Sequence, residues 1–333
     1  MRRAAVQLAG PLALIAAVAV VGHSTSAARE LEFETALVST AIVVALYVFV
    51  GNSGVISFGQ MSFVAVGAFL SGILTIDAQQ KSFVLPGLFP VLRNTHVGTP
   101  LSLVLASLVG GVYALLVGLV LMRLSGLPAG IATFAVLGIT YNVYRNWERI
   151  GPAAQALNSV PGTSIWGLML GCFISVCAAY AYQRSRFGRQ LRATREDPAA
   201  AQASGIDVYR QRLVAFTLSG ALAAFAGGLL VHELGSITTD QLYLELTFLT
   251  LAMLVVGGVG SLWGAVVGAL LVSGIDSFLG DAENTVHIPF RFTLPEGSTL
   301  VLLGALMALV LILRPAGITA SREFSLSWLR RRR

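Results

Sequence analysis

Residues 184–212 read R-S-R-F-G-R-Q-L-R-A-T-R-E-D-P-A-A-A-Q-A-S-G-I-D-V-Y-R-Q-R, and residues 213–228 continue as L-V-A-F-T-L-S-G-A-L-A-A-F-A-G-G. The first stretch holds seven arginines against only Glu196, Asp197 and Asp207, whereas the second holds no charged residue. Lysine and arginine are retained on the cytoplasmic side of membrane proteins. We therefore predict that residues 183–212 form a cytoplasmic loop and that a membrane-spanning helix follows it directly.

The composition of the whole chain agrees with a membrane location. Of its 333 residues, 56% are hydrophobic and 11% are charged, whereas soluble domains carry about 25% charged residues. The apolar residues form runs of about 17–22 residues, the length needed to cross roughly 30 Å of hydrocarbon. We predict an all-α, polytopic transmembrane helical bundle that occupies residues 1–333 as a single domain. Its ten expected spans are 4–22, 35–51, 55–76, 101–122, 128–146, 164–182, 213–231, 242–258, 263–280 and 298–313.

The basic residues set the orientation of these spans. With the basic loop inside, 16 of the 22 lysine and arginine residues fall on the cytoplasmic side, as the positive-inside rule requires. Both termini are then cytoplasmic, including a basic tail over residues 314–333, and we expect a multi-pass protein of the inner membrane. The first apolar segment also has features of a signal peptide, since small residues at 24–28 follow it, but its length favours an uncleaved span.

Metal, disulfide and nucleic-acid sites are not expected. The charges cluster at helix ends without interleaved aromatic residues, which argues against nucleic-acid binding. Cys172 and Cys177 lie five positions apart in one expected helix and so do not share a face. The four histidines fall in separate segments expected on the outer side: His23, His96, His232 and His287.

Nothing in the sequence predicts ATP hydrolysis by this chain. Lys81 is its single lysine, and the motif G-x-x-x-x-G-K-[ST] does not occur. A P-loop needs that lysine against the phosphates. If ATP drives the protein, a separate subunit hydrolyses it, and we expect neither a catalytic residue nor a bound cofactor here.

Small residues recur at intervals of four in two parts of the chain. Such stripes let helix backbones approach closely in lipid, where no hydrophobic effect draws helices together. We interpret both as helix-packing surfaces, although the pattern would also suit helices that slide. The stripes are Gly220, Ala224 and Gly228, and Gly260, Gly264 and Gly268.

A short helix with its own caps is expected inside the basic loop. Asp197 is a good N-cap, Pro198 fits the first helical position, and Gly205 suits the residue beyond the end. Two turns are too short to be stable alone in water. The helix is therefore expected to be held by tertiary contacts or by a partner. A solvated loop that only enforces topology would explain the arginines but not the caps.

This segment carries a resemblance to a known family. Residues 188–227 resemble the coupling segment of ABC permeases for branched-chain amino acids, in particular the M-type subunit of the Liv system. Three further blocks agree in the same order: G-N-S-G-V-I-S-F-G-Q-M-S-F-V-A-V-G-A-F (51–69), L-V-V-G-G-V-G-S-L-W-G-A-V-V-G-A (254–269) and L-R-P-A-G-I (313–318).

The resemblance implies a coupling helix over residues 197–205 that seats in a groove of a cytoplasmic ABC ATPase. Glu196 and Asp197 stand where the family usually carries a Glu-Asn or Glu-Asp pair. The implied partners are ATPase subunits, a second, H-type permease, a periplasmic solute-binding protein and the lipid bilayer. The implied coupling residues are Glu196, Asp197, Pro198, Ala199, Ala200, Ala201 and Gly205.

Two segments depart from the family pattern. Residues 150–161 read I-G-P-A-A-Q-A-L-N-S-V-P where the family usually has a Thr-Gly-Gly-rich stretch, and residues 123–130 read R-L-S-G-L-P-A-G in place of an Arg-Gly-x-Tyr-like segment. Both departures bear on the expected translocation path, so the exact substrate does not follow from the resemblance.

Polar side chains concentrate around the start of the third expected span. Polar groups at membrane depth need partners and often line a water-filled route, although hydrogen bonding between helices explains them equally well. Glu245 and Asp276 are the only acids within expected spans, and exposure at the outer interface is the simpler reading for both. The path candidates are Asn52, Ser53, Ser57, Gln60 and Ser62.

The sequence therefore favours a non-catalytic permease subunit of an ABC importer for branched-chain or related small amino acids. Within the same class, urea, amides or other small solutes remain open as substrates. A second class is an ion-coupled secondary transporter that uses Glu245 or Asp276. A third is an integral membrane enzyme, for which no cluster of nucleophiles, carboxylates or metal ligands is visible.

Overall fold

The computed structural model describes residues 2–284, 298–314 and 316–324. Within these ranges the regular structure is helical, and one isolated β-bridge joins Leu157 to Ile237. The predicted all-α transmembrane bundle is confirmed, because a helix stands at each of the ten expected spans. Among the described residues, eight helices are long and apolar enough to cross a membrane. His287 lies outside the described residues.

The ten helices at the expected spans are α1 (Arg2–His23), α2 (Ala27–Ser53), α3 (Gln60–Thr75), α6 (Thr99–Leu121), α7 (Leu127–Asn146), α8 (Ile165–Arg184), α11 (Val208–Leu234), α12 (Leu244–Gly257), α13 (Leu262–Asn284) and α14 (Ser298–Leu313). The shorter helices are α4 (Ala78–Val84), α5 (Pro90–Asn94), α9 (Arg186–Glu196), α10 (Pro198–Ala203) and the 3-10 helix η1 (Asp240–Leu242).

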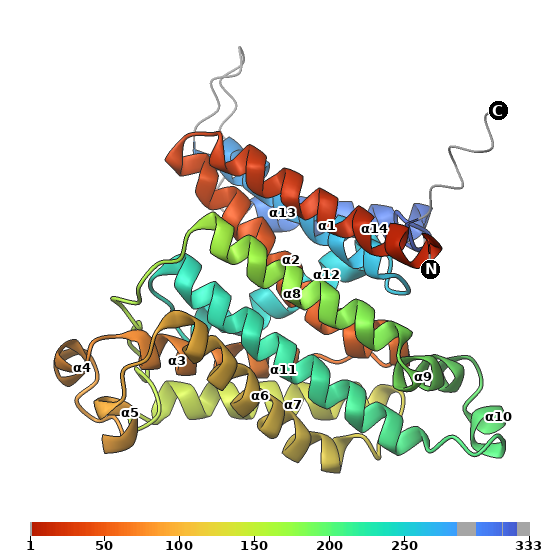
Figure 1. Cartoon of the computed structure of the whole chain (residues 1–333), viewed down its shortest axis with the longest axis horizontal. Coiled ribbons are helices and arrows are strands. Elements are labelled where there is room, and N and C mark those ends of the chain that lie inside the picture. The colour runs from red at the N-terminus through yellow and green to blue at the C-terminus, as the bar shows by residue number, and fades with distance from the viewer. Residues whose placement is uncertain (1, 285–297, 315, 325–333) are drawn as a thin grey trace.

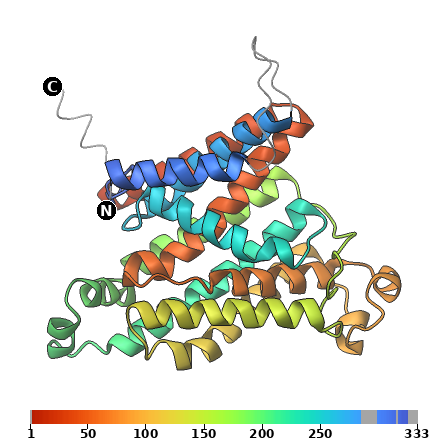
Figure 2. The same cartoon turned by 180° about the vertical axis from the view of Figure 1, so that it is seen from behind.

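The long helices stack in three groups (Figures 1 and 2). Helices α1, α13 and α14 lie along one side, α6 and α7 lie along the opposite side, and α2, α8 and α11 run between them. Helices α9 and α10 lie at one end of the bundle, which we call the basic end, and α4 and α5 lie at the other, the distal end.

Two helices form the centre of the bundle. Every residue of α2 from 36 to 53 is buried, and α11 packs against α2, α3 and α6. A helix that is apolar on all sides can be surrounded by other helices without leaving a polar face unsatisfied. Helix α6, by contrast, buries only one stripe and exposes large apolar side chains elsewhere, as a helix at the lipid boundary does.

Close contacts between small residues join α11 to α6 and α3. A Cβ added at Gly110 would lie 2.1 Å from the Ala224 Cβ, and one added at Gly220 would lie 2.3 Å from the Ala114 Cβ. A Cβ added at Gly67 would lie 1.9 Å from the Ala224 carbonyl oxygen. The first glycine stripe therefore lies at a helix interface, where only small residues fit.

The second stripe divides between a helix and a turn. Gly264 and Gly268 belong to α13 and pack against Gly257 of α12. Gly260 precedes α13 and lies in the α12–α13 turn, where an added Cβ would be 2.8 Å from the Ser321 Cβ. The chain reverses direction in this turn. The four-residue spacing of the glycines therefore continues from a turn that is not helical into α13.

The region expected to be a basic loop is largely helical. Helix α8 continues to Arg184, and α9 then begins with the Ser185 hydroxyl accepting a hydrogen bond from the Gly188 N–H (3.2 Å). Helix α9 buries Gly188, Leu191 and Thr194, which recur every three residues, and leaves most of its arginines exposed. Buried positions that recur in this way are typical of an amphipathic helix, but the many arginines drew attention to a loop.

Residues 316–324 of the expected basic tail fold back onto the α12–α13 turn. The Ile318 N–H donates to the Val256 carbonyl (2.8 Å), and the Glu323 carboxylate accepts from the N–H of Leu262 (3.0 Å) at the start of α13. A carboxylate at a helix N-terminus satisfies a free N–H and complements the helix dipole. Residues 315 and 325–333 lie outside the described residues.

The start of α1 and the folded-back tail both lie at the basic end. The Arg184 guanidinium donates to the Gln7 side chain (2.7 Å), and the Gln183 amide donates to Glu323 (2.7 Å). Both contacts join the end of α8 to a terminal segment.

His232 does not lie in an outer segment, as the sequence suggested, but inside α11. It is fully buried, with Nδ1 2.8 Å from the Pro161 carbonyl oxygen and Nε2 3.0 Å from the Ser71 hydroxyl. A carbonyl can only accept, so Nδ1 carries a proton and donates to Pro161. A second hydrogen bond joins Nε2 to the Ser71 hydroxyl, so the histidine links α11 to α3 and to the segment before α8.

Candidate functional site

A non-helical connector, residues 54–59, joins α2 to α3. The expected third span began at residue 55, but α3 begins only at Gln60. Two side chains satisfy connector N–H groups: Ser53 accepts from Val55 (3.1 Å), and Thr133 of α7 accepts from Phe58 (3.2 Å). Irregular backbone at membrane depth is tolerated where protein buries it or where it lines a water-filled cavity.

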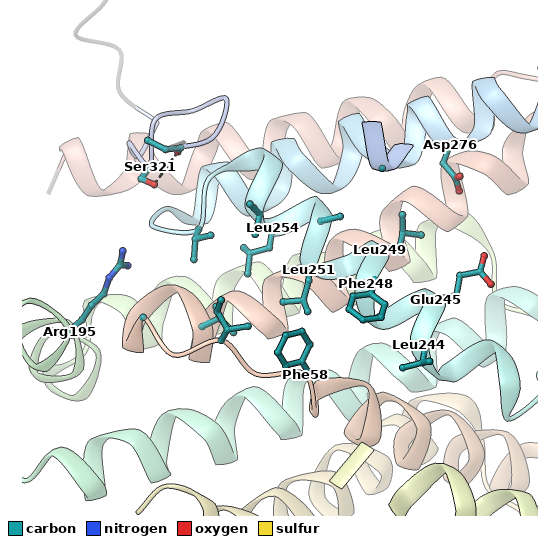
Figure 3. A pocket seen from close by; sticks show the side chains of 18 residues that line it. Phe58, Arg195, Leu244, Glu245, Phe248, Leu249, Leu251, Leu254, Asp276 and Ser321 are labelled. Carbon is teal, nitrogen blue, oxygen red and sulfur yellow. Dashed lines mark hydrogen bonds between the residues drawn. The ribbon is translucent and has the colours of Figure 1, made fainter. Parts of the chain in front are cut away.

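An apolar groove of about 1100 Å³ runs beside this connector. Figure 3 shows the connector along one side of it and α12 along the other. The wall is mostly aliphatic or aromatic. Its lining residues are Val50, Gly54, Ile56, Phe58, Arg195, Leu244, Glu245, Phe248, Leu249, Leu251, Ala252, Leu254, Val255, Val259, Asp276, Gly304, Ala316 and Ser321.

One face of α12 supplies much of the wall. Leu244, Phe248, Leu251 and Val255 recur every three or four residues and all line the groove, as neighbours on one helix face do. From Glu245 to the last turn, α12 rises by roughly 15–20 Å at 1.5 Å per residue. This length is more than half the thickness of a hydrocarbon layer of about 30 Å.

Charged side chains stand at the two ends of the groove. Arg195 of α9 and Ser321 of the folded-back tail lie at the basic end, while Glu245 and Asp276 lie at the distal end (Figure 3). Both acids were expected at the outer ends of their spans, and the structure brings them to the same end of one groove. The arrangement is a long apolar wall with acidic groups at one mouth and a cation at the other.

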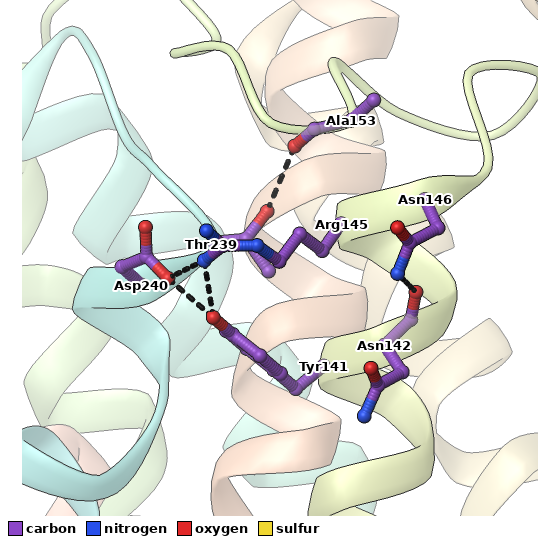
Figure 4. Close-up of polar contacts among 7 residues, drawn as sticks. All are labelled: Tyr141, Asn142, Arg145, Asn146, Ala153, Thr239 and Asp240. Atoms are coloured by element: carbon purple, nitrogen blue, oxygen red, sulfur yellow. Dashed lines mark hydrogen bonds and ion pairs between the residues drawn. The ribbon is translucent and has the colours of Figure 1, made fainter.

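A polar cluster fixes the distal end of α12 (Figure 4). Arg145 of α7 forms an ion pair with Asp240 of η1, and the Tyr141 hydroxyl also donates to Asp240. The Tyr141 ring stacks on Tyr243 with ring centroids 4.1 Å apart. Because Tyr243 directly precedes α12, this cluster lies beside the start of the groove-lining face of α12.

The five path candidates from the sequence lie behind the groove wall. None of them lines the groove, and all are buried, with exposed fractions of 5% or less. The Asn52 amide donates to the Val48 carbonyl (3.0 Å). Polar atoms of Asn52, Ser57, Gln60 and Ser62 have no hydrogen-bond partner among the described residues.

Alternation along the connector separates the lining residues from these candidates. Gly54, Ile56 and Phe58 line the groove, whereas Ser57 is buried behind them. A period of two is typical of an extended segment with two different faces. That alternation could have found the lining residues, but polarity drew attention to the opposite face.

The capped short helix in the basic region is present as α10. The Asp197 carboxylate accepts from the N–H groups of Ala199 (2.9 Å) and Ala200 (3.0 Å), and Gly205 adopts a φ of +79° beyond the helix end. Ala201 is only 5% exposed and faces its own chain, whereas Ala203 is exposed. Ala201, one of the predicted coupling residues, therefore does not belong to the exposed surface of α10.

Together, the helical bundle, the long apolar groove and the capped helix at the basic end define a membrane protein of the permease class. The model of the family described as "Branched-chain amino acid transport system / permease component" matches residues 34–311. The chain belongs to this family.

The relatives carry names of two transport systems. The chain is 24% identical to the high-affinity branched-chain amino acid transport system permease protein LivM of Salmonella typhimurium, over 82% of this chain and 65% of that protein. It is 28% identical to the autoinducer 2 import system permease protein LsrC of an Enterobacter species, over 57% of this chain and 58% of that protein. It is 33% identical to the probable branched-chain amino acid transport permease protein LivH of Methanocaldococcus jannaschii, over 41% of each chain.

The chain thus spans less than two thirds of the length of these relatives. No solved structure matches it.

Proposed function

We propose that this chain is the membrane-spanning subunit of an ATP-binding-cassette importer and that the groove beside α12 is its translocation path. The observation that carries the proposal is the apolar groove that follows α12 between oppositely charged ends. A conduit that a solute passes along has this form, whereas a closed binding site does not need it.

The proposed substrate class is branched-chain or related small amino acids. An aliphatic wall suits an apolar side chain, because burying that surface is favourable. Glu245 and Asp276 would attract an ammonium group at the distal mouth. Urea and short amides lack an apolar side chain and would therefore gain less from the aliphatic wall.

The remaining parts of the proposal concern orientation and partners. The basic end faces the cytoplasm, because arginines concentrate there. Helix α10 seats on an ABC ATPase that hydrolyses ATP, and a second permease covers the open side of the groove. A solute-binding protein delivers the substrate at the distal end, beside α4 and α5.

A bulky substitution in the groove tests the path. In proteoliposomes that hold the purified complex with ATP, we expect Leu251→Trp to lower uptake of labelled leucine about tenfold, since the larger ring narrows the passage and a barrier raised by about 1.4 kcal/mol slows a step tenfold. The matched control is Leu170→Trp, because Leu170 lies on α8 and is 59% exposed. Equal uptake by the two variants would contradict the assignment of the path.

The two acids at the distal mouth favour one alternative, an ion-coupled secondary transporter. That function requires uptake by the purified chain alone, without ATP, driven by a proton or sodium gradient and abolished by Glu245→Gln. The importer proposal predicts no uptake under those conditions.

A further inference from the structure

Arg195 joins the helix pair at the basic end to the groove. It is the penultimate residue of α9, and only Glu196 and Asp197 separate it from α10. Its guanidinium Nη1 donates to the Gly51 carbonyl of α2 (2.7 Å), 144 positions away in the sequence. A contact this distant in sequence ties the α9–α10 pair to the central helix of the bundle.

The accepting carbonyl belongs to the last turn of α2. The last four carbonyls of a helix have no partner within it, and the Gly54 N–H satisfies the one at Val50. Arg195 satisfies the carbonyl at Gly51. A cation at a helix C-terminus also complements the helix dipole, so Arg195 caps α2 from another element.

The aliphatic stem of Arg195 lies against the first residue of the connector. A Cβ added at Gly54 would be 2.9 Å from the Arg195 Cγ. Arg195 also lines the basic end of the groove together with Ser321. A Cβ added at Gly260, in the α12–α13 turn, would be 3.9 Å from the Arg195 Nη1. The Arg195 side chain therefore touches the end of α2 and the connector and lies beside the α12–α13 turn.

We propose that Arg195 is a positioning residue that transmits movement of α9 and α10 to the inner mouth of the groove. The inference rests on the proposed function, because it assumes that a partner moves α10. Helix shifts of about 1–2 Å are typical of such transitions, and a shift of this size changes a 2.7 Å hydrogen bond to Gly51. The start of the connector would move with it, and Gly54 and Ile56 would widen or narrow the groove at its basic end.

The test compares Arg195→Gln with Arg192→Gln in the complete complex. Arg192 is a matched control, because it lies on the same helix and donates to a carbonyl, that of Gln183 (2.8 Å), away from the groove. We expect Arg195→Gln to lower solute transported per ATP hydrolysed about tenfold, as expected when a charge-assisted hydrogen bond is lost. Arg192→Gln should keep the wild-type ratio, and Arg195→Lys, which retains a charged donor, should restore part of it.

Three readouts separate the possible failures. If the wild-type chain recovers no ATPase, the proposed function fails. If the complex forms and transports but Arg195→Gln keeps the wild-type ratio of solute to ATP, the inference about Arg195 fails alone. If Arg195→Gln and Arg192→Gln lower the ratio equally, or Arg195→Lys rescues nothing, Arg195 acts only through the stability of α9, and the inference is again wrong.

Discussion

Gly54 ends α2 with a φ of +72°, a conformation that places the connector along the groove instead of continuing the helix. A left-handed residue other than glycine costs about 1–2 kcal/mol. Here the cost has a second source, because an added Cβ would also meet the Arg195 stem. Gly205 has a similar φ of +79° but nothing within 4 Å of the corresponding Cβ position.

The two glycines predict different responses to the same substitution. Gly205→Ala should cost about 1 kcal/mol from backbone strain alone. Gly54→Ala should cost about 1 kcal/mol more, because Arg195 must move. Thermal unfolding of the purified protein measures both. In an Arg195→Ala background the gap between the two Tm values should close, and a gap that persists would contradict the contact with Arg195.

Helix α10 is a short, capped helix with one buried face and one exposed face. Ala201 points inward, so the positions opposite it on the helix, Ala199 and Ala203, form the face available to a partner. Ala201→Arg would force a charge into the chain's own packing and would report on folding instead of docking.

An arginine on the outward face tests docking directly. We expect Ala203→Arg to leave expression and Tm unchanged but to remove the ATPase from the purified complex, because a bulky charge would occupy the seated face. Ala193→Arg is the matched control, since Ala193 is an exposed alanine on the neighbouring α9. ATPase recovered in wild-type amount with Ala203→Arg would contradict the docking role of α10.

The elements that sequence could predict are those with a single dominant signal. Long apolar runs located the ten helices, and Asp197, Pro198 and Gly205 located α10. The connector was missed because Val55, Ile56 and Phe58 extend an apolar run, and periodicity over so few residues does not separate helix from extended chain. Arg195 was missed among seven arginines, because its contact with Gly51 is made only by tertiary structure.

At the scale of the whole molecule, the groove is connected through the basic end to the exposed face of α10, as the proposed coupling requires. The wall along α12 leads to Arg195, and Arg195 leads through α9 to the exposed face of α10. The tail folds back onto Ser261 and Leu262, so the last described segment of the chain also lies at the basic end. A transporter that runs on the energy of a separate ATPase needs such a connection between its path and its docking surface.

The most direct test of this account is to tag the chain, solubilise native membranes in mild detergent and identify the co-purifying proteins by mass spectrometry. We predict recovery of an ATPase with a P-loop motif and of a second permease. Recovery of the chain alone, stable and monodisperse in several detergents, would contradict the importer proposal and direct attention to Glu245, Asp276 and ion-driven uptake.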